Sequence, residues 1–282
     1  MNTTSNASRF KGLVEFAPTF RPRKEISHII FDFDGTLSLV RGGWTEVMLQ
    51  VCLDHLPPRT DDDATHVREM LLDDILSLNG RPTIFQMIRF TERVAERGVT
   101  PRDAEWYKNE YLARLEQLIS TRKKRLANKE SRSLLEVRGA HAFLTHLQNE
   151  GYRLIMASGT DERFVREESA LLGLDKFFGN HIYAAPTGRE KEFSKRAVIA
   201  HVMQSQNIAA ERLLGFGDGH VETENITEFG GLAVAVASDE QNPGSAKIDP
   251  WKRQRLLGVG AQIVIPDYAD GPALMDVILG KA

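Results

Sequence analysis

The stretch that decides the fold of this chain is Ile29-Ile30-Phe31-Asp32-Phe33-Asp34-Gly35-Thr36-Leu37. Its apolar first half, followed by turn residues, is typical of a short strand buried on both faces of a parallel sheet. Gly35 allows the backbone to turn sharply after the strand. In open α/β sheets, ligands bind at the carboxyl ends of the strands. The stretch therefore predicts a binding site directly after a central strand.

Two carboxylates, Asp32 and Asp34, stand at that strand end. They point to the same side if the strand continues through them. If the chain bends at Gly35, one side chain can face a substrate while its neighbour offers a backbone carbonyl oxygen. Two acidic groups this close repel each other unless a cation or a shared proton neutralises them. A bound Mg²⁺ is the simplest solution to that repulsion.

Composition excludes several classes of protein. The 282 residues allow one large or two modest domains, and a net charge of −3 argues against a dedicated nucleic-acid binder. The single cysteine, Cys52, permits no internal disulfide and no cysteine metal cluster, which fits a reducing compartment. No apolar run approaches the roughly 20 residues of a membrane span, and no secretory signal is evident. We expect a cytoplasmic protein without a membrane or nucleic-acid partner.

The apolar pattern changes along the chain. Helical spacing replaces strand-like runs from about Thr45 to Glu136, as in Ile84, Ile88 and Ala95 on one face. The polar N-terminus is expected to be mobile, with Phe16 and Phe20 packing on the surface. The expected parts are an N-terminal arm (1–24), an α/β core (25–44 and 137–282) and a helical insert (45–136).

The core segments alternate between strand and helix patterns. Strands are expected at 152–157, 181–183, 212–216, 232–237 and 262–265, and helices at 140–150, 162–172, 195–204 and 271–279. Thr160 or Asp161 can cap the helix that begins at Glu162. Strands that alternate with helices predict an α/β fold with a doubly wound, Rossmann-like parallel sheet.

Polar residues of catalytic types follow three of these strands: Asp32 and Asp34, Ser158, and Asp218. Lys195 begins a helix between the last two. The ends of parallel strands converge on one edge of the sheet. Such a set suits phosphoryl transfer to a carboxylate nucleophile, with Mg²⁺, a hydroxyl and an ammonium group stabilising the charge and a second carboxylate moving protons.

At these residues the chain resembles the haloacid dehalogenase-like (HAD) hydrolases, in particular phosphatases with a C1 cap. The resemblance rests on four motifs in order: Asp32-Phe33-Asp34-Gly35-Thr36-Leu37, Ala157-Ser158-Gly159-Thr160, Lys195, and Gly217-Asp218-Gly219-His220-Val221-Glu222. The helical insert stands where this family places its cap. Asp34 matches the phosphatases and phosphomutases of the family, and not its dehalogenases.

The resemblance implies a role for each motif residue. Asp32 is the expected nucleophile and a metal ligand, and Asp34 is the general acid/base and a metal ligand through its carbonyl oxygen. The expected phosphate-binding residues are Gly35, Ser158, Gly159 and Lys195, and the remaining metal ligands are Asp218 and Glu222.

Two motifs leave alternatives open. The family usually has an aspartate where this chain has Glu222, so Glu222 can act on the metal through water, and Glu224 competes for that role. Lys191 competes with Lys195 for the role of motif lysine. We prefer Lys195 because it begins a helix after Ser194.

Two further segments are candidates for substrate contact. Arg41 can touch a substrate anion, and Gly42 and Gly43 suit a hinge between core and insert. The loop Asn79-Gly80-Arg81-Pro82-Thr83 either points at the site or is a simple turn.

The sequence therefore predicts a Mg²⁺-dependent phosphatase acting on a small phosphate monoester, such as a sugar phosphate or a phosphoglycolate-like acid. The alternatives are a phosphomutase for a sugar phosphate and a non-catalytic binding protein with the same fold. A phosphatase for nucleic-acid ends is disfavoured by the charge balance.

Overall fold

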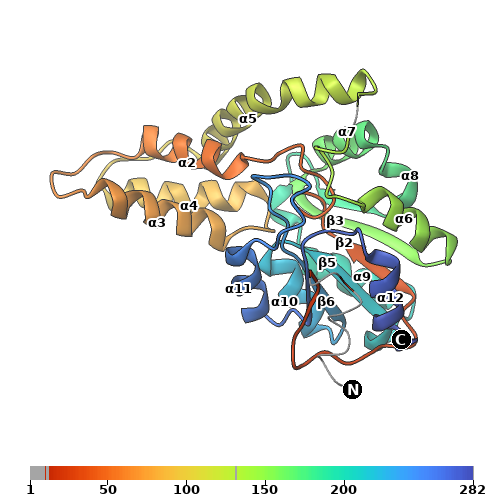
Figure 1. Ribbon diagram of the computed structural model, residues 1–282. Helices are drawn as coiled ribbons and strands as arrows, with labels where there is room; N and C mark the ends of the chain where they lie inside the picture. The colour runs from red at the N-terminus through yellow and green to blue at the C-terminus, as the bar shows by residue number, and fades with distance from the viewer. Residues whose placement is uncertain (1–9, 11–12, 131, 282) are drawn as a thin grey trace.

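The computed structural model describes residues 10, 13–130 and 132–281, which form an α/β core with a helical insert projecting from it (Figure 1). The sheet order is β1-β7-β6-β5-β2-β3-β4, and all neighbours are parallel except β1 and β7. Strand β2 therefore lies between β5 and β3 and carries Asp32 to the middle of the carboxyl edge. The strands are β1 (Glu15–Phe16), β2 (His28–Phe31), β3 (Arg153–Asp161), β4 (Ile182–Ala185), β5 (Leu213–Gly217), β6 (Leu232–Val236) and β7 (Ile263–Ile265).

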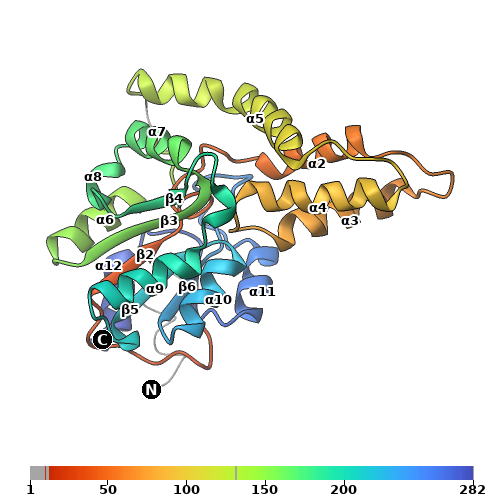
Figure 2. The same ribbon diagram turned by 180° about the vertical axis from the view of Figure 1, so that it is seen from behind.

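Helices cover both faces of the sheet, as Figures 1 and 2 show from opposite sides. Along β2, Ile29 and Phe31 pack into one apolar cluster and Ile30 into another, because successive side chains point to opposite faces. The first face is covered by α6 (Ala140–Asn149), α7 (Glu162–Leu172), α8 (Asp175–Phe178) and α12 (Gly271–Ile278), and the second by α9 (Lys195–Ser205), α10 (His220–Glu228) and α11 (Pro250–Gly258). The predicted doubly wound α/β fold is confirmed.

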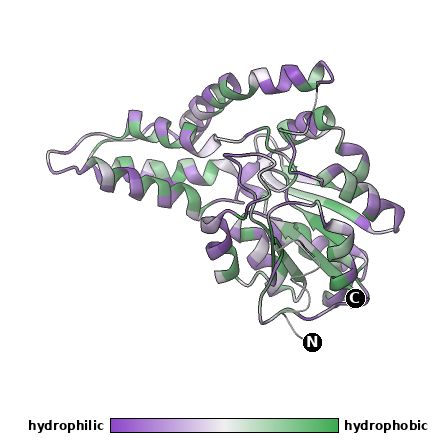
Figure 3. Cartoon of the chain, in the orientation of Figure 1, coloured by the Kyte–Doolittle hydropathy of each residue, from purple (hydrophilic) through white to green (hydrophobic). Residues whose placement is uncertain are grey.

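Hydropathy follows this layering, with apolar residues concentrated in the strands and on the inward helix faces (Figure 3). Aromatic rings fill the first face of the sheet, where Phe31 stacks on Phe216 with ring centroids 4.9 Å apart. The Phe143 ring stacks on Tyr268 in the same cluster, 5.3 Å away. This packing fixes β2 against β5, and so fixes the two strands that carry acidic motifs. Within the described residues, no helix has the length and apolar character needed to cross a bilayer.

The segment before β2 is attached to the sheet. Glu15 and Phe16 pair with Val264 and Ile263 of β7 in antiparallel register. Phe16 and Phe20 are partly buried against the main core. The expectation of a mobile arm is therefore wrong for these residues, because the short strand β1 pairs with β7 and the rings of Phe16 and Phe20 pack on the core. Most of residues 1–12 lie outside the described part of the chain.

The insert contains four helices: α2 (Trp44–His55), α3 (Ala64–Ser77), α4 (Thr83–Glu96) and α5 (Ala104–Ala127). Asp63 and Asp103 cap α3 and α5, each accepting a hydrogen bond from a backbone amide of the first turn. Buried faces of these helices join the apolar cluster of the first sheet face. The last of these helices ends at Ala127, and residues 128–130 and 132–139 lead back to the core.

The two linkers between core and insert lie side by side. The Leu39 amide donates to the Leu135 carbonyl oxygen, and the Val137 amide donates to that of Leu37. Gly43 adopts a left-handed conformation, with φ 89°, directly before α2 begins. That conformation suits glycine and is consistent with the chain changing direction between core and insert.

Candidate active site

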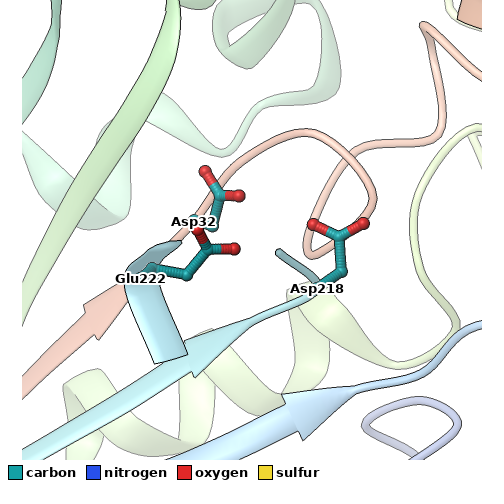
Figure 4. A group of neighbouring side chains, drawn as sticks. All are labelled: Asp32, Asp218 and Glu222. Atoms are coloured by element: carbon teal, nitrogen blue, oxygen red, sulfur yellow. The ribbon is translucent and has the colours of Figure 1, made fainter. Parts of the chain in front are cut away.

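Four segments bring polar side chains together at the carboxyl edge of the sheet. They are the loop after β2, the end of β3, the first residue of α9 and the turn from β5 into α10. Figure 4 shows Asp32 and Glu222 near each other and Asp218 facing them across a gap. One cavity is lined by most of the residues to which the sequence assigned phosphoryl chemistry: Asp32, Asp34, Ser158, Gly159, Lys195 and Asp218.

Lys195 connects two of the carboxylates. Its Nζ lies 2.9 Å from Oδ1 of Asp32 and 3.0 Å from Oε2 of Glu222. All three side chains are buried. The other Glu222 oxygen accepts a hydrogen bond from the Gly219 amide at 2.5 Å. Ser194 caps the helix that begins at Lys195, so the first turn of α9 is held at the site.

Burial and the mutual charges of Asp32, Lys195 and Glu222 shift the pKa of each of these side chains. Burial raises the pKa of Asp32 well above its ordinary value, because Lys195 offsets only part of the desolvation and Glu222 and Asp218 add repulsion. Burial alone would lower the pKa of Lys195, but Asp32 and Glu222 outweigh it and raise that pKa. Burial alone would raise the pKa of Glu222, but the attraction of Lys195 outweighs burial and lowers that pKa. The ammonium group of Lys195 therefore stays charged.

Asp218 closes the other side of the group. Its Oδ2 accepts a hydrogen bond from Lys252 Nζ at 3.0 Å, and its Oδ1 lies 3.4 Å from the Thr36 hydroxyl. Burial raises the pKa of Asp218 to about 6, although Lys252 acts against the rise. Gly35, with φ +72°, makes room for this carboxylate, since a Cβ there would lie 2.1 Å from Oδ2.

Asp34 has different partners from Asp32. The Thr160 hydroxyl donates to its Oδ2 at 2.8 Å, and Arg41 Nε lies 3.8 Å from its Oδ1. That Oδ1 is buried without a hydrogen-bond partner among the described residues. Burial raises the pKa of Asp34, with Arg41 acting in the opposite direction. The two aspartates of the first motif thus occupy separate environments: Asp32 lies beside an ammonium group, and Asp34 lies beside a hydroxyl and a guanidinium group.

Ser158 and Gly159 form the second motif at the end of β3. Ser158 is buried, and its Oγ accepts a hydrogen bond from the Thr160 amide at 3.2 Å. Gly159 lies directly under the insert, because a Cβ there would be 2.7 Å from the Arg81 carbonyl oxygen. Asp161 precedes α7 without a side-chain capping bond and pairs instead with Lys108, 3.0 Å away.

The insert completes the cavity. The loop 79–83 lies over the site, where Gly80 also approaches Glu222. The cavity volume is about 60 Å³, several times the roughly 10–15 Å³ that one water molecule needs. Its insert wall carries two aromatic side chains and groups that can form hydrogen bonds: Trp44, Asn79, Arg81, Thr83, Gln86 and Tyr111.

Three predicted site residues have contacts within the fold. Arg41 lines the cavity, but its guanidinium donates three hydrogen bonds to the buried Glu168, at 2.8 to 3.1 Å. Gly42 is not among the described residues that line the cavity, and its carbonyl oxygen accepts a hydrogen bond from Arg122 at 2.7 Å. The Gly35 amide, a predicted phosphate donor, donates to the Ser38 carbonyl oxygen at 2.9 Å. These groups are therefore engaged within the fold, and Arg41 faces Asp34 as well as the cavity.

The alternatives left open by the sequence are separated in space. Lys191 is exposed in the short helix η1 (Glu190–Glu192), whereas Lys195 is buried against Asp32. Glu224 is exposed, whereas Glu222 is buried in the acidic group. His220 lies beside Arg255, whose Nη2 is 3.1 Å from its Nδ1.

The acidic group fits a divalent cation. One oxygen from each of Asp32, Asp218 and Glu222 lies within 4.8 Å of the others. Counting Glu240, four carboxylates stand here against the two ammonium groups of Lys195 and Lys252. A divalent ion would balance that excess, and carboxylate oxygens are the donors that Mg²⁺ and Ca²⁺ prefer. The Asp34 side chain is not part of this cluster.

Sequence reasoning missed several charged partners of the site, namely Lys108, Glu168, Glu240 and Lys252. Lys108 and Glu168 carried a usable signal. Lys108 precedes Tyr111 by three residues and Leu115 by seven, so it shares their buried face on α5, where a charged residue needs a partner. Glu168 follows Val165 by three residues and precedes Leu172 by four on the buried face of α7. Glu240 and Lys252 carried no such signal, and Lys252 lies 34 positions from Asp218.

The model of the haloacid dehalogenase-like hydrolase family matches residues 26–224. The chain belongs to this family. The match spans all four motifs and the whole helical insert. No curated protein is significantly similar to the chain in sequence.

Solved structures of HAD-like proteins share the fold. A predicted phosphoglycolate phosphatase from Haemophilus somnus aligns with 14% identity and a TM-score of 0.59, covering 89% of this chain and 98% of the other. The β-phosphoglucomutase of Clostridium difficile aligns with 12% identity and a TM-score of 0.60, covering 91% and 98%. A hydrolase from Pseudomonas syringae aligns with 15% identity and a TM-score of 0.60, covering 90% of this chain and 99% of the other. At such identities the likeness shows the fold alone.

Proposed function

We propose that this HAD-like hydrolase is a Mg²⁺-dependent phosphatase that hydrolyses a small phosphate monoester through an aspartyl-phosphate intermediate. The observation that carries the proposal is the division of the first motif. Asp32 lies 2.9 Å from the Lys195 ammonium group, whereas Asp34 is bonded to the Thr160 hydroxyl, and both line one cavity. One carboxylate is thus placed beside the Lys195 ammonium group as a nucleophile. The other faces the Arg41 guanidinium at 3.8 Å but keeps Oδ1 without a hydrogen-bond partner among the described residues, so that oxygen can exchange a proton.

In the first step, an Asp32 oxygen attacks phosphorus, and the bond from phosphorus to the alcohol oxygen breaks. Asp34 in its protonated form gives its proton to the departing alcohol. In the second step, Asp34 takes a proton from water, whose oxygen attacks phosphorus and releases inorganic phosphate and the free Asp32 carboxylate. The raised pKa of Asp34 is consistent with its carrying the proton in the first step.

Several groups would stabilise the transferring phosphoryl group. The Ser158 hydroxyl, the Gly159 amide and the Lys195 ammonium group all lie at the cavity wall and can hold its oxygens. Asp32, Asp218 and Glu222, with the Asp34 carbonyl oxygen, would hold Mg²⁺. When bound, the ion supplies charge neutralisation between the nucleophile and the phosphate anion.

The size of the substrate follows from the insert. The loop 79–83 covers the cavity and approaches the core at Gly159, so a bulky alcohol has no room beneath it. Such a cover excludes water during the first step. The solved relatives described as a phosphoglycolate phosphatase and a β-phosphoglucomutase act on small phosphorylated molecules by name, which agrees with this proposal.

Hydrolysis of an aryl phosphate in the presence of Mg²⁺ tests the proposal. We expect the wild-type protein to release phosphate and Asp32→Asn to be inactive while keeping the same thermal stability. Equal rates for the two proteins would refute it. A panel of phosphorylated metabolites then identifies the substrate, and conversion of a sugar phosphate to its isomer without free phosphate would reveal a phosphomutase instead.

A further inference from the structure

The two oxygens of Asp218 have different surroundings. Oδ2 accepts a hydrogen bond from Lys252 Nζ at 3.0 Å and lies against the backbone of Gly35. Among the residues that the structure describes, Oδ1 has only the long 3.4 Å hydrogen bond from the Thr36 hydroxyl. One oxygen of this carboxylate is therefore occupied by the protein itself, and the other remains available to a ligand.

Lys252 is held firmly in this position. Its amide donates to Asp249, which caps α11, and its Nζ also bonds to Glu240 at 2.5 Å. The side chain is 12% exposed. The ammonium group thus stands between two carboxylates, those of Asp218 and Glu240. Among the described residues, the cavity lining includes Asp218 but neither Lys252 nor Glu240, so this pair approaches the carboxylate from outside the cavity.

The loop that carries Glu240 is tied to the first motif. The Ser238 hydroxyl donates to the Gly35 carbonyl oxygen at 3.0 Å, and the Asp249 amide donates to Ala237 at 2.8 Å. The loop and the start of α11 therefore position Lys252 with respect to the turn at Gly35. Loss of the Lys252 ammonium group would free Oδ2 of Asp218 without removing a group from the cavity.

The number of available carboxylate oxygens distinguishes divalent cations. Mg²⁺ demands near-ideal octahedral geometry at short distances, whereas Ca²⁺ takes six to eight oxygens and readily accepts both oxygens of one carboxylate. A carboxylate with one oxygen bonded to an ammonium group offers a single oxygen to a metal ion. That suits Mg²⁺, whereas Ca²⁺ lacks the second carboxylate oxygen that it would bind.

We propose that Lys252 is a positioning residue that makes the acidic cluster selective for Mg²⁺ over Ca²⁺, by occupying one oxygen of Asp218 while Glu240 holds Lys252 in place. This inference rests on the metal site of the proposed function. It assigns a role to Lys252 and Glu240, which are not among the described residues that line the cavity.

Calorimetric titration of the metal-free, full-length protein with MgCl₂ and with CaCl₂ tests the inference without any activity measurement. For Lys252→Met we expect the ratio of the Ca²⁺ to the Mg²⁺ dissociation constant to fall about tenfold, because Ca²⁺ gains an oxygen that Mg²⁺ does not use. Lys252→Arg, which keeps the positive charge and a donor, should retain the wild-type ratio. Lys247→Met, an exposed change in the same loop, serves as the matched control.

Glu240→Gln provides a second test that leaves Lys252 in place and still applies where Lys252→Met fails to fold. We expect the same ratio to fall about threefold, because Lys252 loses one of its two anchors. Ratios within about twofold of wild type in every folded variant of Lys252 and Glu240 would overturn this inference alone. Failure of the wild-type protein to bind Mg²⁺ at all would overturn both the inference and the proposed metal dependence.

Discussion

The carbonyl oxygen of Arg81 in the insert lies against Gly159 of the core, at a distance that leaves no space for a side chain. A Cβ on Gly159 would be 2.7 Å from that oxygen. Because Gly159 lacks a positive φ, alanine fits its backbone and would act only by pushing the insert loop away. The pair therefore offers a way to disturb the cover of the site without touching its chemical groups.

For Gly159→Ala we expect kcat/KM for an aryl phosphate to fall by about 100-fold, because small displacements of positioning groups have effects of this size. Thermal stability should change little. Gly258→Ala, at a glycine whose added Cβ would meet no atom within 4 Å, is the matched control. Wild-type kinetics for Gly159→Ala would contradict close approach of the insert loop during turnover.

Replacement of Lys195 tests which lysine serves the site. Lys195→Met leaves the buried Asp32 and Glu222 without their shared cation, so we expect a loss of about 3–5 kcal/mol in the free energy of unfolding of the metal-free protein and loss of hydrolysis. Lys191→Met should change neither quantity, since Lys191 is exposed. Urea unfolding and phosphate release measure the two effects, and the reverse pattern would reassign the motif lysine.

Glu222 and Glu224 give a matched pair for metal binding. We expect Glu222→Gln to weaken Mg²⁺ binding by about tenfold, because it removes one charge from the acidic cluster. Glu224→Gln, an exposed change two residues away, should leave the dissociation constant unchanged. Calorimetric titration compares them, and equal effects of the two changes would argue against a special role for Glu222.

Lys108 links the insert to the core through a buried ion-pair group. Its Nζ lies 3.0 Å from both Asp161 and Glu190, and all three side chains are buried. Lys108→Met leaves two buried carboxylates unpaired, and we expect a loss of about 3–5 kcal/mol in the free energy of unfolding. Lys124→Met, on the exposed side of the same helix, should be neutral. A neutral Lys108→Met would show that the insert stays attached without this group.

The same group predicts a pH dependence. Burial acts to raise the pKa of Glu190, but the Gly188 amide and Lys108 outweigh it and hold that pKa below the ordinary 4.5. A lowered carboxyl pKa stabilises the fold above pH 4.5, and this contribution is lost as the pH falls through the folded-state pKa. We expect the stability difference between wild type and Glu190→Gln to be full near neutrality and to shrink in acid.

Urea unfolding at several pH values measures this difference. Glu192→Gln, an exposed change in the same short helix, should show no such trend. A difference that stays constant from neutrality into acid would contradict a role for the Glu190 charge.

The sequence alone was sufficient for most of the α/β core. The apolar runs that predict parallel strands also carry the polar residues at their ends, and strand position fixes where those ends meet. Asp32, Ser158, Lys195 and Asp218 were therefore predicted to lie together. The polar helices α10 and α11 were not predicted, because each buries few apolar residues and shows little periodicity.

Only the tertiary structure decided what surrounds those motif residues. Arg41 bonds to Glu168, Lys252 bonds to Asp218, and Lys108 reaches Asp161 and Glu190. These contacts join residues from 34 to 127 positions apart and arise where separate elements pack. The local sequence pattern shows which face of a helix or strand is apolar. It does not show which charged side chain of another element will contact that helix or strand. Such contacts depend on how the insert and the loop before α11 pack against the sheet.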